Sequence, residues 1–240
     1  MISKAEVIVL GLVLYKEKNL IVKTLSKQDG IKTFFLSRSS GKSKRKDRNN
    51  YQVFSMLEVV SKSSSKSSLP RITESKNLHL LLSLRTDVGK NAMAFLLSEI
   101  LSKCVQEEEP NTLLYDFITS KIIVLDKCSS SFANFHLHFI CQLTKHLGIC
   151  PVPNNDKNTI FDIREGEFNK YKPSHPHFLK TQESQLFQRF LFETWEEVQS
   201  IKLSGQKRSY LLTEILKYFQ YHVPGFEQPK SLEILNDVFS

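Results

Sequence analysis

The chain has 240 residues, 40% of them hydrophobic, and a formal net charge of +8. This apolar content is enough for a packed core, which excludes global disorder, and no apolar run approaches the roughly 20 residues of a membrane-spanning helix. The charge is concentrated, because residues 1–80 hold 16 Lys and Arg against 6 Asp and Glu, whereas residues 81–240 hold 17 against 19. A basic block beside a near-neutral body indicates a nucleic-acid binder with a second surface for protein partners. Because the chain has no apolar run of membrane-spanning length, no membrane partner is expected.

The first 80 residues have the pattern of short β-strands. Their segments are rich in β-branched and aliphatic residues or alternate in polarity, and Asp29-Gly30 is a strong turn signal. The predicted strands are 6–15, 19–27, 31–36, 51–60 and 69–80, with the Ser/Lys-rich segment 61–68 as a flexible hairpin tip. Five short strands in about 75 residues predict a closed barrel of the OB kind, although the pattern alone leaves an SH3-like barrel open.

A strongly basic segment, SRSSGKSKRKDRNN at residues 37–50, separates the third and fourth predicted strands. It has no aliphatic or aromatic residue, so it is predicted to be a long mobile loop. Such barrels commonly bind nucleic acid at this kind of loop, and clustered cations hold phosphates with little sequence choice. The alternative is a solvated loop without a partner. The predicted nucleic-acid-binding residues are Arg38, Lys42, Lys44, Arg45, Lys46 and Arg48, with Lys23 and Lys32 on the neighbouring strands.

Four aromatic residues of the same region are candidates for stacking on bases: Phe34, Phe35, Tyr51 and Phe54. Burial in the barrel core is the expected role for most of them.

After Asp87 the apolar residues recur with the period of amphipathic helices. The predicted helices are 93–104, 114–125, 135–147, about 184–201 and about 206–221. The sequence therefore predicts an α+β multidomain protein, with an N-terminal OB-fold barrel (1–80) followed by an all-helical C-terminal domain (81–240). An irregular insertion at about 150–178 is rich in Pro, Asn and His and is expected to hold one hairpin around 161–168.

No metal site is predicted. The cysteines, Cys104, Cys128, Cys141 and Cys150, form no CxxC pair, so they are expected to be reduced thiols and not zinc ligands. His136 and His138 are two residues apart on a predicted helix, where they face different directions, and both are expected to be partly exposed.

No catalytic residue and no cofactor are predicted, because the chain contains no HExxH or GxSxG motif. The alternative, a hydrolase or transferase, would need a site assembled from distant residues such as Asp162, Glu165, His175 and His177.

The chain resembles the RecO family along nearly its whole length, and most of all the branch without zinc. The matching stretches are VLGLVLYKEKNLIVKTLSKQDG (9–30), the basic loop after it, NAMAFLLSEILSKCVQEEEPNTLLYDFI (91–118), ANFHLHFICQLTKHLGICP (133–151), IFDIREGEF (160–168) and LLTEILKYFQYHVPGFEQPKSLEILNDVF (211–239). The resemblance implies an OB domain, a helical domain and a ribbon insertion that carries two close cysteine pairs in many members. Only Cys150 is kept here, so a degenerate, zinc-less ribbon held by packing and hydrogen bonds is expected.

The resemblance also implies a function. RecO-like proteins are non-enzymatic mediators of DNA repair and homologous recombination in the RecF pathway. They bind single- and double-stranded DNA, anneal complementary strands, and act with RecR to load RecA onto strands coated by SSB. A cytoplasmic, nucleoid-associated protein is therefore expected. An RNA-binding or ribosome-associated OB-fold adaptor is the alternative, because the same charges would serve it.

A second site follows from the resemblance, since the helical domain of RecO-like proteins binds the acidic, hydrophobic C-terminal tail of SSB. By position, the predicted contacts are Phe139 and Leu143 as an apolar floor and His138 or Lys145 as a cationic rim. Ordinary core positions for Phe139 and Leu143 are an equally good interpretation.

Overall fold

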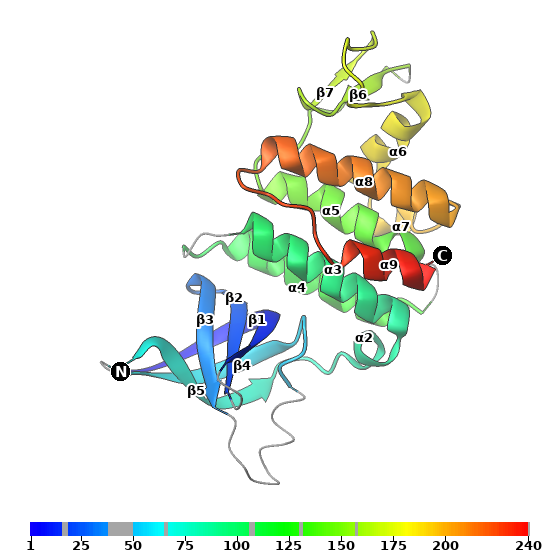
Figure 1. Cartoon of the computed structure of the whole chain (residues 1–240). Coiled ribbons are helices and arrows are strands. Elements are labelled where there is room, and N and C mark those ends of the chain that lie inside the picture. The colour runs from blue at the N-terminus through cyan, green and yellow to red at the C-terminus, as the bar shows by residue number, and fades with distance from the viewer. Residues whose placement is uncertain are drawn as a thin grey trace. The chain divides into compact units, whose positions relative to one another are not determined.

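The computed structural model describes seven stretches of the chain: residues 1–15, 19–37, 50–64, 67–105, 109–129, 132–156 and 158–239. Its backbone contacts divide the chain into two units, Met1–Lys127 and Cys128–Ser240. The first unit contains a β-barrel and three helices, and the second contains further helices and a small sheet (Figure 1).

The barrel has five strands, which the sequence pattern predicted. They are β1 (Ile2–Tyr15), β2 (Asn19–Ser26), β3 (Gly30–Ser37), β4 (Met56–Ser64) and β5 (Ser67–Asn77). The strand order is β1-β2-β3-β5-β4, and antiparallel pairing of β1 with β4 closes the barrel. The β3–β5 pair is parallel, with Phe35 opposite Arg71. The predicted OB-like barrel is confirmed, and closure satisfies strand edges that would otherwise be open to other chains.

Alternation along the strands decides which side chains fill the barrel. Val7, Val9, Val22, Phe34 and Leu57 belong to the buried core cluster. Because successive side chains of a strand point to opposite faces, the neighbours of these residues lie on the outside of the barrel.

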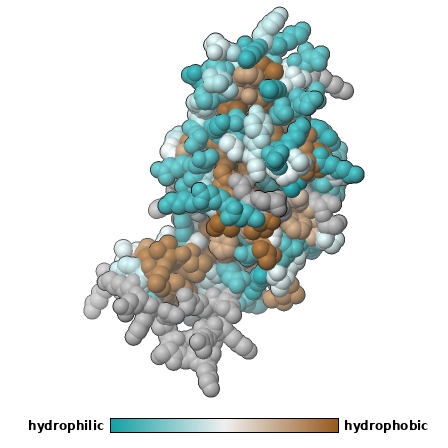
Figure 2. All heavy atoms as spheres, turned by 45° about the vertical axis from the view of Figure 1, so that its right-hand side comes forward, coloured by the Kyte–Doolittle hydropathy of each residue, from teal (hydrophilic) through white to brown (hydrophobic). Residues whose placement is uncertain are grey.

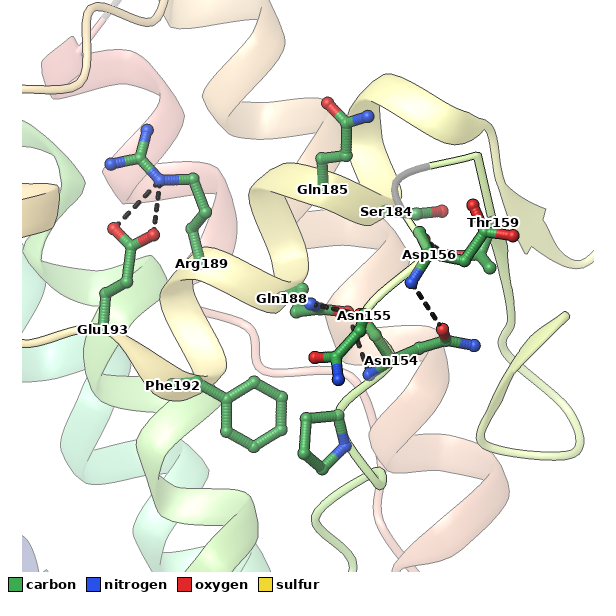
Figure 3. A pocket seen from close by; sticks show the side chains of 11 residues that line it. Asn154, Asn155, Asp156, Thr159, Ser184, Gln185, Gln188, Arg189, Phe192 and Glu193 are labelled. Carbon is green, nitrogen blue, oxygen red and sulfur yellow. Dashed lines mark hydrogen bonds and ion pairs between the residues drawn. The ribbon is translucent and has the colours of Figure 1, made fainter.

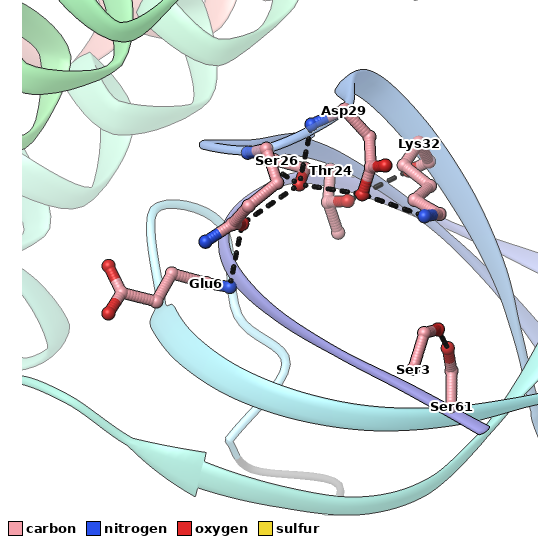
Figure 4. A network of polar contacts seen from close by, with 8 residues as sticks. Ser3, Glu6, Thr24, Ser26, Asp29, Lys32 and Ser61 are labelled. Atoms are coloured by element: carbon pink, nitrogen blue, oxygen red, sulfur yellow. Dashed lines mark hydrogen bonds and ion pairs between the residues drawn. The ribbon is translucent and has the colours of Figure 1, made fainter. Parts of the chain in front are cut away.

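Two predicted boundaries in the barrel are wrong. The fourth strand begins at Met56 and not at residue 51, because the preceding turn places buried Phe54 at a positive φ of 63°. The backbone N–H of Phe54 donates to the carbonyl of Val9 at 2.8 Å, and this hydrogen bond attaches the turn to β1. The predicted flexible tip at 61–68 is mostly strand, since Ser61 is buried and hydrogen-bonded to Ser3 at 2.9 Å (Figure 4).

Three helices follow the barrel within the first unit: α2 (Leu82–Thr86), α3 (Val88–Cys104) and α4 (Thr112–Lys127). Lys90 is buried among them, and its Nζ donates to Ser83 Oγ at 2.7 Å and to the carbonyl of Asp126 at 3.0 Å. The Asp126 carboxylate accepts the N–H of Leu84 at 2.8 Å, so polar contacts join all three helices. The predicted domain boundary after residue 80 follows the change of secondary structure and stays a prediction.

The second unit is built around α5 (Phe135–His146), which is buried on all sides from Phe135 to Cys141. The elements around it are η1 (Phe132–Asn134), α6 (Thr181–Phe192), α7 (Trp195–Val198), α8 (Gly205–His222) and α9 (Leu232–Phe239).

The single helix predicted over 184–201 is wrong. It ends at Phe192, and α7 starts anew with a capping box in which the Glu197 carboxylate accepts the N–H and the hydroxyl of Thr194. Helix α9 was not predicted.

The predicted hairpin in the insertion is confirmed. It consists of β6 (Ile160–Asp162) and β7 (Glu167–Asn169), and β8 (Phe178–Leu179) pairs with β6 on the other side. The Phe161 ring lies 4.8 Å from Phe168, 4.7 Å from Phe187 on α6 and 5.4 Å from Tyr218 on α8, measured between ring centroids. An aromatic cluster therefore packs the hairpin onto two helices.

Polar contacts complete the hairpin. The Asp162 carboxylate accepts the N–H groups of Arg164 at 2.9 Å and Glu165 at 3.2 Å, and it lies 3.3 Å from His175 Nε2. Among the residues that the structure describes, no three His, Cys, Asp or Glu side chains gather as metal ligands would. In the same part of the chain, no helix is long and apolar enough to cross a bilayer.

Candidate nucleic-acid interface

The predicted interface is only partly within the described residues. Arg38, Lys42, Lys44, Arg45, Lys46 and Arg48 lie outside them, so their contribution stays a prediction from sequence. Lys23 on β2 and Lys32 on β3 are described, and both have partners within the first unit.

Lys23 joins the barrel to α3. Its Nζ donates to the carbonyl of Ser102 at 2.9 Å, in the last turn of the helix, where carbonyl groups lack partners within the helix. Burial lowers the pKa of Lys23 below its usual value. This ammonium group is therefore committed to holding α3 on the barrel.

Lys32 belongs to a polar network at the β2–β3 turn (Figure 4). Its Nζ lies 2.7 Å from Asp29 Oδ2, and Asp29 in turn accepts the hydroxyl of Ser26. The Ser26 hydroxyl oxygen accepts the N–H groups of Gln28 and Asp29, a typical stabilisation of a tight turn. Since a partly exposed ion pair contributes at most about 1 kcal/mol, a phosphate can compete with Asp29 for this lysine.

The outer surface of β1, β2 and β3 carries a row of apolar and aromatic side chains. The strand register places Val13 beside Ile21, Ile21 beside Phe35, and Phe35 beside Arg71 on β5. Tyr15, at the end of β1, has its ring centroid 6.4 Å from that of Phe35 in an edge-to-face arrangement. Figure 2 shows apolar side chains gathered on the surface of the barrel.

Of the four aromatic residues predicted as stacking candidates, the structure buries three. Phe34, Tyr51 and Phe54 are buried within the barrel unit, as expected for most of them, whereas Phe35 is half-buried and faces outward. Tyr15 was not considered from the sequence, although its even spacing from Val13 is a usable signal.

The predicted tail-binding residues of α5 do not form a surface. His138, Phe139 and Leu143 are buried, and His138 Nε2 lies 3.1 Å from the carbonyl of Glu193. The expected partial exposure of His136 and His138 is wrong, because both lie in the stretch of α5 that is buried on all sides, Phe135 to Cys141. Phe139 and Leu143 occupy core positions.

Lys145 is the exposed member of this predicted set, and it lies beside a pocket that the sequence did not indicate. Its Nζ is 5.4 Å from the centre of the Phe192 ring and 3.0 Å from Gln142 Oε1. Phe192 lines a pocket of about 640 Å³ between α6 and the loop that precedes the hairpin (Figure 3). The remaining lining residues are mostly polar: Pro153, Asn154, Asn155, Asp156, Thr159, Ser184, Gln185, Gln188, Arg189 and Glu193.

The charges of this pocket are largely paired. Arg189 Nε donates to both carboxylate oxygens of Glu193, at 2.8 and 2.9 Å, and Gln188 Nε2 donates to the carbonyl of Asn154 at 2.7 Å. The pocket therefore offers an aromatic end next to the Lys145 ammonium group and a wall of side-chain amides.

The residues of the catalytic alternative are only partly brought together. Asp162 and His175 do lie together, but the carboxylate is buried and occupied by the backbone of the hairpin turn. The His177 ring is 6.0 Å from that of His175, and Glu165 is exposed.

Comparison with known proteins agrees with this architecture. Residues 1–80 match the family model "Recombination protein O N terminal", and residues 85–233 match "Recombination protein O C terminal". The chain is 32% identical to the DNA repair protein RecO of Flavobacterium psychrophilum, covering 99% of each chain, and 30% identical to that of Christiangramia forsetii, covering all of both. The RecO protein of Flavobacterium johnsoniae is 30% identical over 99% of each chain. The chain therefore belongs to the RecO family.

Proposed function

We propose that this chain mediates DNA repair and homologous recombination by binding DNA through its first unit. The match to DNA repair proteins over the full length of both chains carries the proposal. The distribution of charge supports it, because Met1–Lys127 holds 21 Lys and Arg against 13 Asp and Glu, whereas Cys128–Ser240 holds 12 of each. A surplus of cations on a barrel suits a polyanion bound without sequence choice.

The proposed activity is the annealing of complementary strands in the RecF pathway, without turnover of a substrate. Two polyanions repel each other, so a cationic surface that binds single- and double-stranded DNA lowers the cost of bringing them together. With RecR, the protein would help to load RecA onto single strands coated by SSB. Such a role places it in the cytoplasm, at the nucleoid.

For the acidic SSB tail we propose the pocket beside Phe192 as the binding site. The burial of Phe139 and Leu143 argues against the surface predicted from sequence. An acidic peptide with an aromatic side chain needs an apolar contact next to a cation, and Phe192 with Lys145 supplies both.

We expect Lys145→Gln to weaken binding of a labelled tail peptide several-fold, measured by fluorescence anisotropy. Unchanged affinity would exclude this site, and Lys180→Gln, on the surface of the same unit, is the control.

The DNA-binding proposal is tested with a variant in which the six cations of the basic segment are replaced by serine: Arg38, Lys42, Lys44, Arg45, Lys46 and Arg48. We expect weaker binding of a labelled single strand and a slope of log K against log[salt] that flattens by about 0.7 for each lost phosphate contact. Fluorescence anisotropy over a salt series measures both quantities.

The matched control replaces six exposed lysines of the second unit: Lys145, Lys170, Lys172, Lys180, Lys202 and Lys230. It removes the same charge from the near-neutral unit, so affinity and slope should stay close to those of the unmodified chain. An equal loss in both variants would contradict binding by the first unit. A strong preference for structured RNA over single-stranded DNA in the same assay would favour the RNA-binding adaptor instead.

A further inference from the structure

We propose that Tyr15, Phe35 and Arg71 form a platform on which unpaired bases of single-stranded DNA stack. The proposal rests on the proposed function and deepens it. Cations hold the phosphates of any nucleic acid, whereas a stacking platform selects strands whose bases are free.

The platform is assembled by the barrel topology from three strands. Phe35 on β3 faces outward because its neighbour Phe34 fills the core. The parallel β3–β5 pairing then brings Arg71 beside it, with the guanidinium carbon 5.2 Å from the centre of the Phe35 ring. Tyr15 lies at the end of β1, and its ring centroid is 6.4 Å from that of Phe35.

These groups are accessible to a ligand. Tyr15 is 41% exposed, Arg71 is exposed, and Phe35 is half-buried between them. Val13, 62% exposed, adds apolar surface next to the aromatic rings. The surface of a barrel strand rarely needs so much apolar area for stability, since these side chains contribute little to the core.

The chemistry of the platform suits a nucleobase. Bases stack on aromatic rings and on guanidinium planes, and the stacking tolerates any sequence because every base has a flat face. In a duplex those faces are already stacked on each other and cannot reach the barrel. The platform therefore discriminates between unpaired and paired strands.

The surroundings favour a polyanion over an apolar protein partner. The strand segments that carry the face, 11–15, 19–23 and 33–37, contain no Asp or Glu. Arg71 adds a cation directly on the Phe35 ring, and Lys62 lies opposite Arg71 in the β4–β5 register. A single strand meets both features at once, with bases on the rings and phosphates beside the cations.

The test compares three labelled probes of equal length: a single strand, the same strand with abasic sites in place of its bases, and a duplex. The abasic strand keeps the phosphates and lacks the stacking groups. We expect the unmodified chain to bind the ordinary strand at least about tenfold more tightly than the abasic one. In the Tyr15→Leu/Phe35→Leu variant this preference should disappear, while affinity for the duplex stays within about twofold.

Three further variants keep the result interpretable. Tyr15→Leu alone changes an exposed side chain at a strand end, so it should fold normally and lose part of the preference. Arg71→Lys keeps the charge and removes the planar group, and it should also lose part of the preference. Tyr171→Leu removes an 81% exposed aromatic side chain of the second unit and should change nothing.

The two proposals fail in different ways. If the unmodified chain binds the ordinary and the abasic strand equally well with a steep salt dependence, the platform is overturned and the proposed function stands. If the chain binds none of the three probes, both are overturned. A double variant that loses affinity for the duplex and the single strand to the same extent also overturns the platform, because stacking should not affect a duplex.

Discussion

His136 lies in the first turn of α5 with its ring buried, and its environment opposes protonation. Burial, reinforced by the nearby Arg208 guanidinium, lowers the pKa of His136 to about 3. In the unfolded chain the same ring titrates near pH 6.5. Between these values the unfolded chain binds a proton that the folded chain does not.

This difference predicts a pH-dependent stability. The contribution of neutral His136 is fully present above about pH 6.5 and declines as the pH falls, by up to about 1.4 kcal/mol per pH unit until about pH 3. We expect His136→Leu to reduce the loss of unfolding free energy between pH 7 and pH 5 by about 2 kcal/mol. Urea unfolding of both proteins at the two pH values measures the effect, and equal losses would show that another group is responsible.

The contacts of Lys23 and His138 could not be predicted from the sequence. Lys23 was predicted as a nucleic-acid contact, and the strand pattern does not reveal that its ammonium group meets the carbonyl of Ser102, 79 residues later. The burial of His138 has the same origin, since helices distant in sequence cover α5. Contacts of this kind depend on tertiary packing, and no local pattern encodes them.

At the level of elements, the β6–β7 hairpin is held without close cysteine pairs. The Phe161 ring contacts three other aromatic rings, and the Ser184 hydroxyl accepts the N–H of Phe161 at 2.8 Å. The Asp162 carboxylate fixes the turn through two backbone N–H groups. Packing and hydrogen bonds of the chain's own side chains therefore attach the hairpin to α6 and α8.

We therefore expect a chelator such as EDTA to leave the melting temperature unchanged. Phe161→Ala should instead destabilise the fold by about 3–5 kcal/mol, because it empties a fully enclosed aromatic site. Thermal unfolding followed by circular dichroism measures both effects. Tyr171→Ala, at an exposed position of the same insertion, should lie within about 0.5 kcal/mol of the unmodified chain. A clear fall of melting temperature with EDTA would contradict this account.

Most helices and strands were predicted correctly, and the errors at 184–201 and 61–68 have physical causes. The apolar period continues through 184–201, so it masks the break after Phe192, yet Thr194 and Glu197 stand at the spacing of a capping box and signal a new helix. At 61–68 the composition, and not the apolar period, led to the wrong prediction. Its Ser/Lys composition is typical of loops, but Ser61 faces inward with its hydroxyl satisfied by Ser3.

For the whole molecule, the order of elements was predictable because the apolar period changes from two to 3.6 near residue 87. The concentration of charge was equally visible, since it requires only counting. The candidate site was less accessible: Phe35 was considered from sequence, but Arg71 joins it only through the parallel β3–β5 pair, which depends on how the barrel closes. The six loop cations lie outside the described residues, so their role is still the one predicted from sequence.

The contact between Lys23 and Ser102 affects where two related proteins can be joined to make a chimera. The N-terminal family model ends at residue 80, whereas the unit that packs together extends to Lys127. A chimera of two relatives joined at residue 80 would set one parent's β2 against the other parent's α3, so the lysine and the helix end that it contacts would come from different parents. A junction at residue 127 keeps the barrel with its own three helices. The module that can be exchanged intact is thus longer than the module that sequence comparison delimits.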